Sequence, residues 1–158
     1  MLTVNIICIG KLKESYLRDA CAEYVKRLGA FCRLNLVELP EHRLPAEPSA
    51  AEIARGLAAE GEAILQKCRG FVAALCIEGR ECSSPQLAAK LAALALDGVS
   101  EVSFLIGGSF GLSEEVKRRA DWRLSMSPMT FPHQLARVML LEQVYRACSI
   151  NAGGKYHK

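Results

Sequence analysis

The alternation of apolar, strand-like runs with amphipathic, helix-like segments limits most strongly how this chain can fold. The run Leu2–Ile9 is rich in valine and isoleucine and is followed by Gly10, which is typical of a strand buried on both faces. Across 14–31, apolar residues recur at helical spacing and basic residues occupy the other side. Strands that alternate with helices predict an α/β fold, with a mostly parallel sheet and helices on both of its faces.

The same alternation continues to the end of the chain. Ser83, Pro85 and Gln86 form a helix-start signal, a capping box with proline in the first turn. Three prolines interrupt Pro40–Pro48 and predict a loop, in which His42 is expected to be exposed and is given no role. Further strands are expected at 34–39, 71–77, 102–106 and 122–126, and further helices at 49–67, from 83 to about 97, from 113, and at 132–150.

Length and composition set the broad class. A chain of 158 residues, 51% hydrophobic and 23% charged, predicts one globular domain over residues 1–158. The net charge of +3 permits an RNA partner without requiring one.

The seven cysteines are dispersed and form no C-x-x-C pair, so we expect no metal, no disulfide framework and a reducing cytoplasm. The run Ile6–Ile9 is too short to span a bilayer, so no membrane association is expected.

A glycine loop is the first candidate binding feature. Gly107, Gly108 and Gly111 follow a predicted buried strand and precede a helix capped by Ser113. Ligands bind beyond the carboxyl ends of strands in open α/β sheets, and glycines let a ligand approach the backbone. The pattern is neither G-x-G-x-x-G nor a P-loop. From the pattern alone, a ligand-binding loop and a tight strand-to-helix turn stay equally open.

A second candidate is the segment Met126–His133, which joins a strand to the last helix. Its apolar side chains can wall a pocket, and its backbone amides can bind the edge of a ring. The simpler interpretation is a rigid connector capped by Ser127 or Thr130, and the pattern favours it. His133 is expected to have a structural role at the helix start, beside the same cleft.

The end of the chain is the third candidate. The last helix is apolar on one side, as a core or a dimer interface requires, and Arg137 and Arg146 belong to its polar residues. Glu142 and Arg146 stand four residues apart, so a surface ion pair is the simplest role for Arg146. The terminal Lys155–Lys158 carries an aromatic ring, an imidazole and two positive charges, which suit phosphate, a base and proton movement. A frayed polar terminus is the alternative.

These motifs together resemble a known family. The stretches Phe104–Leu112, Leu124–Gln134, Glu142–Arg146 and Tyr156–Lys158 are similar to the bacterial ribosomal RNA large subunit methyltransferases of the H type, which are SPOUT-class enzymes. The resemblance covers essentially the whole chain, in motif order and spacing. One mild departure is the final Lys158, where some members carry arginine and a further residue. Lysine keeps the charge but loses the bidentate geometry.

The resemblance implies an S-adenosylmethionine-dependent enzyme that methylates N3 of a pseudouridine in 23S rRNA, on the assembled ribosome. It also implies the SPOUT fold with a C-terminal trefoil knot, and a homodimer with the cofactor pocket near the subunit interface. No DNA partner is expected. By motif position, the cofactor should contact Leu75, Gly107, Met126, Ser127, Pro128, Met129, Thr130 and Phe131, and the target nucleotide should meet Arg146, Tyr156, His157 and Lys158.

The resemblance also frames the chemistry. The imide nitrogen must lose its proton before it attacks the methyl group, so a nearby base or cation should help. His157 is the candidate for proton acceptance or base positioning, and Arg146 and Lys158 for stabilising negative charge or holding phosphate. Two alternatives stay open. A non-catalytic ribosome-binding factor on the same scaffold would not bind the cofactor, and a flavodoxin-like protein would need a phosphate loop after the first strand, where Gly10 stands alone.

Overall fold

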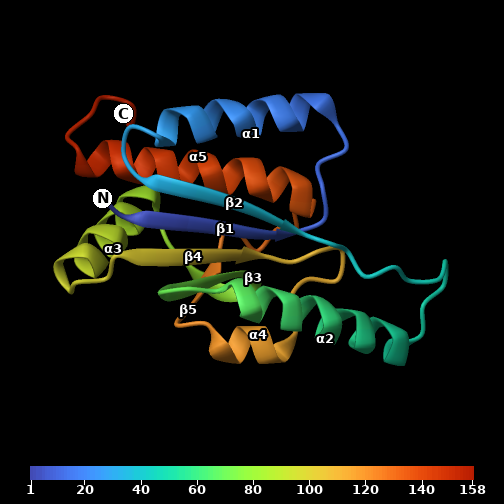
Figure 1. Cartoon of the computed structure of the whole chain (residues 1–158). Coiled ribbons are helices and arrows are strands. Elements are labelled where there is room, and N and C mark those ends of the chain that lie inside the picture. Colours follow the sequence, from blue (N-terminus) through green and yellow to red (C-terminus); the bar gives the residue numbers. More distant parts are fainter.

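A computed structural model describes all 158 residues and contains one five-stranded, fully parallel sheet in the order β2-β1-β4-β3-β5 (Figure 1). The predicted α/β class is therefore confirmed, and each expected element is present. The strands are β1 (Thr3–Ile9), β2 (Arg33–Leu39), β3 (Phe71–Glu81), β4 (Glu101–Ile106) and β5 (Trp122–Ser125). The helices are α1 (Ser15–Leu28), α2 (Ala50–Lys67), α3 (Ser84–Leu96), α4 (Glu114–Arg119) and α5 (His133–Asn151).

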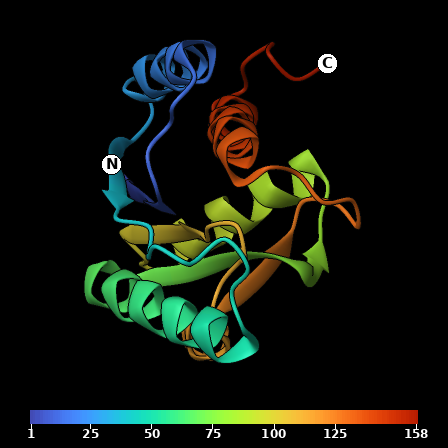
Figure 2. The same cartoon turned by 90° about the vertical axis from the view of Figure 1, so that its right-hand side faces the viewer.

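The helices cover both faces of the sheet. Helices α1, α3 and α5 pack together on one face, and α2 and α4 lie on the other (Figures 1 and 2). Strand β1 alternates between the two layers: Val4, Ile6 and Cys8 join the core under α1, α3 and α5, whereas Ile7 and Ile9 join the core over α2 and α4. Such two-sided burial explains why this strand is a continuous apolar run.

Local sequence signals fix most helix ends. The Ser83–Gln86 capping box predicted for α3 is present, and Ser49 and Glu52 form an equivalent box at the start of α2. Helix α1 ends at Leu28, three residues before the expected Phe31, with Gly29 as its C-cap. No helix is long and apolar enough to cross a membrane.

Strand β3 departs from the prediction, which ended it at Ile77. The strand continues to Glu81, but its pairing with β5 shifts between Leu75 and Arg80, so that the intervening residues bulge out of the ladder. Gly79 permits this close approach, because a Cβ atom there would lie 2.8 Å from the carbonyl oxygen of Arg123. A glycine inside a strand is a signal of such irregularity.

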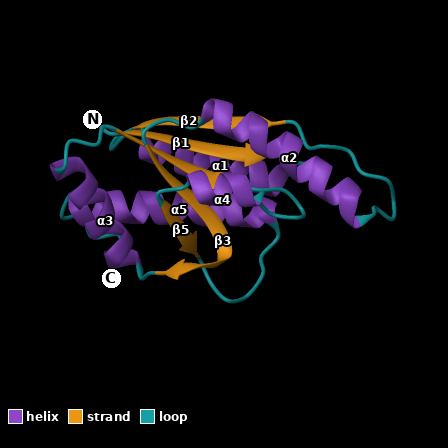
Figure 3. Ribbon diagram, turned by 90° about the horizontal axis from the view of Figure 1, so that it is seen from below, coloured by secondary structure: helices purple, strands orange, loops and turns teal.

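The strand order brings remote segments together. Strands β4, β3 and β5 are neighbours in the sheet, and the second half of β3 bends away from the first (Figure 3). The bulged middle of β3 and the loops that follow β4 and β5 come together at the carboxyl edge. The chain passes from β4 through α4 to β5, across β3. The trefoil knot that the family resemblance implies stays a prediction.

Candidate functional site

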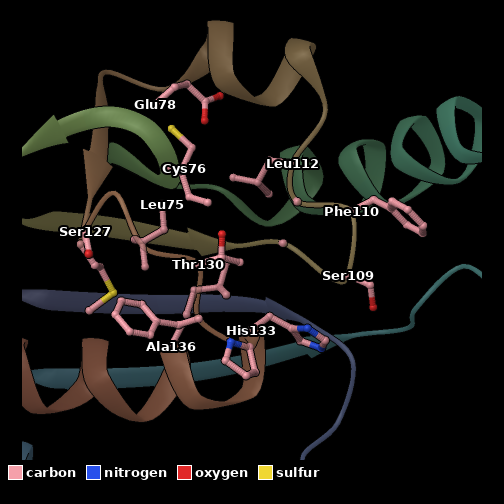
Figure 4. A pocket seen from close by; sticks show the side chains of 18 of the residues that line it. Leu75, Cys76, Glu78, Ser109, Phe110, Leu112, Ser127, Thr130, His133 and Ala136 are labelled. Atoms are coloured by element: carbon pink, nitrogen blue, oxygen red, sulfur yellow. The ribbon is translucent and has the colours of Figure 1, made fainter.

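A cavity of about 790 Å³ opens at this carboxyl edge, between the bulged middle of β3, the loops that follow β4 and β5, and the first turn of α5 (Figure 4). Seven of the eight residues predicted to contact the cofactor line it: Leu75, Gly107, Met126, Ser127, Met129, Thr130 and Phe131. The eighth, Pro128, belongs to the same loop but is exposed and does not line the cavity. The structure therefore joins two sequence motifs that are separate along the chain.

The glycine loop forms one wall with its backbone. A Cβ atom at Gly107 would collide with the backbone of Gly111, which itself adopts a positive φ of 78°. An isolated bridge between Gly108 and Gly111 closes the loop. Side chains larger than hydrogen would force this turn open, so the glycines keep main-chain groups directly at the cavity.

The loop after β5 is held in shape by two serines. The Ser127 hydroxyl accepts a hydrogen bond of 3.0 Å from the Met129 amide, and the Ser125 hydroxyl donates one of 3.1 Å to the Ser127 carbonyl. These local bonds replace regular secondary structure and hold Thr130 and Phe131 toward the cavity.

Sequence reasoning missed several lining residues. The β3 bulge brings Cys76, Ile77 and Glu78 to the cavity, and Lys117 reaches Glu78 from α4 at 2.5 Å. This ammonium lowers the pKa of Glu78, so the carboxylate is charged at neutral pH. His133 was expected beside the cleft and does line the cavity, and burial lowers its pKa, so its imidazole is neutral there.

The lining is mostly apolar, with main-chain groups and only a few charges at its rim. Such a surface suits a largely apolar small molecule better than a polyphosphate, and the volume is within the range of small-molecule sites. No cluster of three or more histidine, cysteine, aspartate or glutamate residues stands close enough to hold a metal ion.

The C-terminal residues gather at the other end of α5. Arg146 donates two hydrogen bonds to Oε1 of Glu142, at 2.9 Å from Nε and 2.5 Å from Nη2. Its Nη1 lies 3.2 Å from Nδ1 of His157, and its guanidinium stacks 4.7 Å from the centre of the Tyr156 ring. The predicted ion pair is confirmed, and it is the base of a larger cluster.

The Tyr156 hydroxyl also donates to Glu142 at 3.2 Å. Its hydrogen bond with Tyr24, burial and the Glu142 charge raise the pKa of Tyr156 to about 12, so its hydroxyl remains protonated and can donate to Glu142. Its ring packs edge-on against Tyr145 at 4.8 Å. Lys158 is exposed and makes no hydrogen bond or ion pair. The tail is therefore docked on α5 rather than frayed.

The cavity and this cluster stand apart within one chain. His133 lies at the cavity and Arg146 in the cluster, which separates them by about 20 Å along α5 at 1.5 Å per residue. Figure 1 shows the C-terminus at the opposite end of α5 from the loop that follows β4. One chain does not bring its two predicted residue sets together.

The burial of Arg137 contradicts the sequence interpretation, which placed this residue on the polar side of the last helix. It is 1% exposed, and it pairs with Glu38 of β2 at 2.5 Å and donates to the Gly10 carbonyl at 2.9 Å. The Glu38 partner lies 99 residues away, so no local signal distinguished Arg137 from its exposed neighbours. This pair fixes the first turns of α5 to the sheet edge beside the cavity.

Comparison with known proteins gives a consistent picture. The family model described as "Predicted SPOUT methyltransferase" matches residues 2–157. The chain is 51% identical to the ribosomal RNA large subunit methyltransferase H of Bifidobacterium adolescentis and 48% identical to that of Ligilactobacillus salivarius, covering 99% of this chain and 100% of each relative.

Solved structures share the fold at low identity. A probable methylase family protein from Haemophilus influenzae Rd KW20 matches with a TM-score of 0.56 at 16% identity, over 98% of this chain and 70% of that one. A putative methyltransferase from Legionella pneumophila, in complex with S-adenosylmethionine, matches with a TM-score of 0.51 at 13% identity, over 92% of this chain and 66% of that one.

Proposed function

Since the chain belongs to the SPOUT methyltransferase family, whose members use S-adenosylmethionine, we propose that it methylates N3 of a pseudouridine in 23S rRNA. The observation that carries the proposal is the pairing of an apolar, backbone-lined cavity with a cationic C-terminal cluster. The rRNA class of the substrate follows from relatives that are about half identical over their whole length. The pseudouridine and its N3 atom rest on the motif resemblance.

We assign the cofactor to the cavity of 790 Å³. The glycine loop and Met126–Phe131 offer main-chain groups to the adenine edge, and the apolar walls exclude water from the reacting atoms. When bound, S-adenosylmethionine supplies a methyl group on a sulfonium and leaves as a neutral thioether. The protein therefore has to align nucleophile and methyl group, and alignment provides much of the rate gain.

We assign the acceptor base to the C-terminal cluster. Arg146 can only donate, so its contact with Nδ1 of His157 requires an unprotonated Nδ1 and leaves the proton on Nε2. In this state His157 positions the pyrimidine by donating to a carbonyl. The imide proton passes to a solvent water before methyl transfer, and the Arg146 charge stabilises the anion that remains. Lys158, free of other partners, holds a phosphate.

We propose a homodimer because neither half of the site is complete in one chain. The separation of about 20 Å along α5 exceeds the reach of a nucleotide base. A second copy packed on α5 in the opposite direction supplies its own cluster to the cavity, and the symmetry gives two equal sites. A groove of about 460 Å³ lies along α5 between α1 and α3. Val138, Met139 and Glu142 line this groove and are only half-buried in one chain, so a second copy can contact them.

The first test measures transfer of a labelled methyl group from S-adenosylmethionine to intact ribosomes, separate subunits and naked 23S rRNA, with and without the pseudouridine. We expect label only on assembled, pseudouridylated ribosomes, because the weakly basic surface favours recognition of shape. Label on no substrate despite cofactor binding would reassign the substrate. Absence of both would favour the non-catalytic ribosome-binding factor.

The second test determines whether the cavity and the cluster of one active site come from the same chain or from two chains. Gly107→Ala and Arg146→Ala are each expected to lose nearly all activity, the first through the cavity and the second through the cluster. Mixed and reassociated in equal amounts, they should recover about a quarter of wild-type activity, because half of the dimers then hold one intact site. No recovery, with mixed dimers demonstrated by native mass spectrometry, would place both halves in one chain.

We locate the reaction in the cytoplasm, in keeping with seven unpaired cysteines.

A further inference from the structure

A second cavity of about 420 Å³ lies beside the first and is not used by the proposed methyl transfer. The Pro40–Pro48 loop, helix α2 and the tip of the glycine loop enclose it. It shares Ser109 and Phe110 with the first cavity, so one loop forms a wall of both. A ligand group in one cavity and a ligand group in the other would therefore lie on opposite sides of this loop.

The walls of this second cavity are held in place by His42. Its backbone N–H donates to Oε2 of Glu60 at 2.9 Å. Its imidazole lies on Gly56, where a Cβ atom would come within 3.1 Å of the ring. The proline-containing loop is therefore attached to α2 at two points one helical turn apart, and the cavity is formed before any ligand arrives.

The floor of the cavity is a carboxylate with a free oxygen. Glu60 is only 9% exposed, pairs with no cation, and uses one oxygen for the His42 amide. Its Oε1 makes no hydrogen bond and faces the backbone of Gly108 at the cavity. This oxygen has no partner within the chain and is accessible from the cavity, so a ligand that donates a hydrogen bond can reach it.

The rim of the cavity carries an exposed aromatic ring. Phe110 is 52% exposed at the tip of the glycine loop, and in Figure 4 its ring points away from the other side chains of the first cavity, toward α2. Bases of unpaired RNA stack on such rings. Glu41 and Glu60 make the interior unfavourable for a phosphate, whereas Arg43 is exposed at the edge.

We propose that this cavity binds one unpaired base with an exocyclic amino group, from the RNA strand next to the methylated nucleotide. The base stacks on Phe110 and its amino group donates to Glu60, as carboxylates accept from the amino group of cytosine. Uracil has a carbonyl oxygen at that position. This acceptor would face the Glu60 carboxylate, which is also an acceptor, so the contact would be unfavourable. The inference rests on the proposed RNA substrate and adds a sequence preference to it.

Binding is tested without methyl transfer. The dimeric protein is saturated with S-adenosylhomocysteine, and CMP, AMP and UMP are titrated while backbone amide resonances of His42 and Gly107–Gly111 are followed. We expect CMP and AMP to bind about tenfold more tightly than UMP, as one base-specific contact provides. Inorganic phosphate alone should leave these resonances unchanged.

Variants assign the preference to residues. Glu60→Gln presents an amide N–H₂ to the cavity and should reverse the preference toward UMP. Phe110→Leu should weaken all three nucleotides about tenfold, and Phe110→Trp should restore them. Glu62→Gln, on the exposed side of α2, is the matched control and should behave like the wild type.

The KM for ribosomes distinguishes the failure of this inference from failure of the proposed function. Glu60→Gln should raise that KM several-fold and leave cofactor affinity unchanged. A wild type that methylates ribosomes, combined with variants that alter neither nucleotide binding nor KM, would overturn the base site. Displacement of the nucleotides by a lysine-rich peptide at lower concentration would overturn it too, in favour of a protein partner. A wild type that binds CMP but methylates nothing would overturn only the proposed reaction.

Discussion

The cavity at the carboxyl edge and the cluster at the end of α5 are built in opposite ways. The cavity takes its walls from the bulged middle of β3 and from the loops after β4 and β5, and its shape depends on main-chain packing at Gly107 and on serine-braced turns. The cluster takes its side chains from one helix and the tail that follows, and its geometry depends on charge, with Arg146 held between Glu142 and His157. Shape suits a compact cofactor, whereas charge suits an anionic nucleotide.

This difference predicts how each region fails. Damage to the cavity should abolish cofactor binding, because a misshapen wall excludes the ligand entirely. Damage to the cluster should lower turnover and spare the cofactor. Variants of the two regions therefore separate binding from chemistry.

The largest effect is expected from Gly107→Ala. Its methyl group would enter the space of the Gly111 backbone, so the loop must open, and affinity for S-adenosylmethionine should fall about 1,000-fold, as loss of several contacts at once implies. Isothermal titration calorimetry measures this directly. Gly98→Ala is the control: it also has a positive φ, of 82°, but meets no neighbour and lies outside the cavity, so it should retain cofactor binding. Equal losses in both variants would refute a specific role for the loop.

Arg146→Ala should lower kcat about 100-fold by removing the charge that stabilises the imide anion. The affinity for S-adenosylmethionine should change less than about twofold, because we assign Arg146 to the acceptor base and not to the cofactor. Single-turnover methylation and calorimetry give the two values. Lys158→Ala, which removes an unpaired charge, should mainly raise the KM for ribosomes. A variant at Arg146 that lost cofactor binding would contradict the division between the two regions.

Arg137→Met tests the connection between them, since this residue holds the first turns of α5 at the sheet edge. Removing the buried guanidinium leaves Glu38 and the Gly10 carbonyl without their partner, and we expect a loss of about 2 kcal/mol, reduced from the fully buried case because Glu38 is 35% exposed. Urea denaturation measures it. Arg27→Met breaks the exposed i,i+4 pair with Glu23 and should lower stability much less, because solvent screens this pair. Similar losses in the two variants would argue against an anchoring role.

The smallest effect concerns Glu60 and pH. Burial raises the pKa of Glu60 above its ordinary value of 4.5, so the folded state favours the protonated carboxyl. The folded state then binds more protons than the unfolded state, and wild-type stability falls as pH rises from about 4.5 through the folded pKa. The free energy of unfolding of Glu60→Gln should therefore exceed that of the wild type by about 0.5 kcal/mol at pH 7. This difference should vanish near pH 4. Thermal unfolding at both pH values checks the sign.

Local features of the sequence determined much of the fold. The two-sided apolar run at Ile6–Ile9, the capping box at Ser83 and the glycines after β4 each act within a few residues, so the order of strands and helices followed from them. The motifs also identified the loops of the cavity, with Pro128 as the one predicted contact that does not line it.

Only the tertiary structure decided how distant segments meet. It revealed the bulge that brings Glu78 to the cavity, the pairing of Arg137 with Glu38, and the closure of a second cavity by His42 on Glu60. It also placed the cavity and the C-terminal cluster at opposite ends of α5, which the motifs did not specify. The physical reason is that periodicity and capping report interactions along the chain, whereas strand order and burial depend on contacts between residues that the sequence keeps far apart.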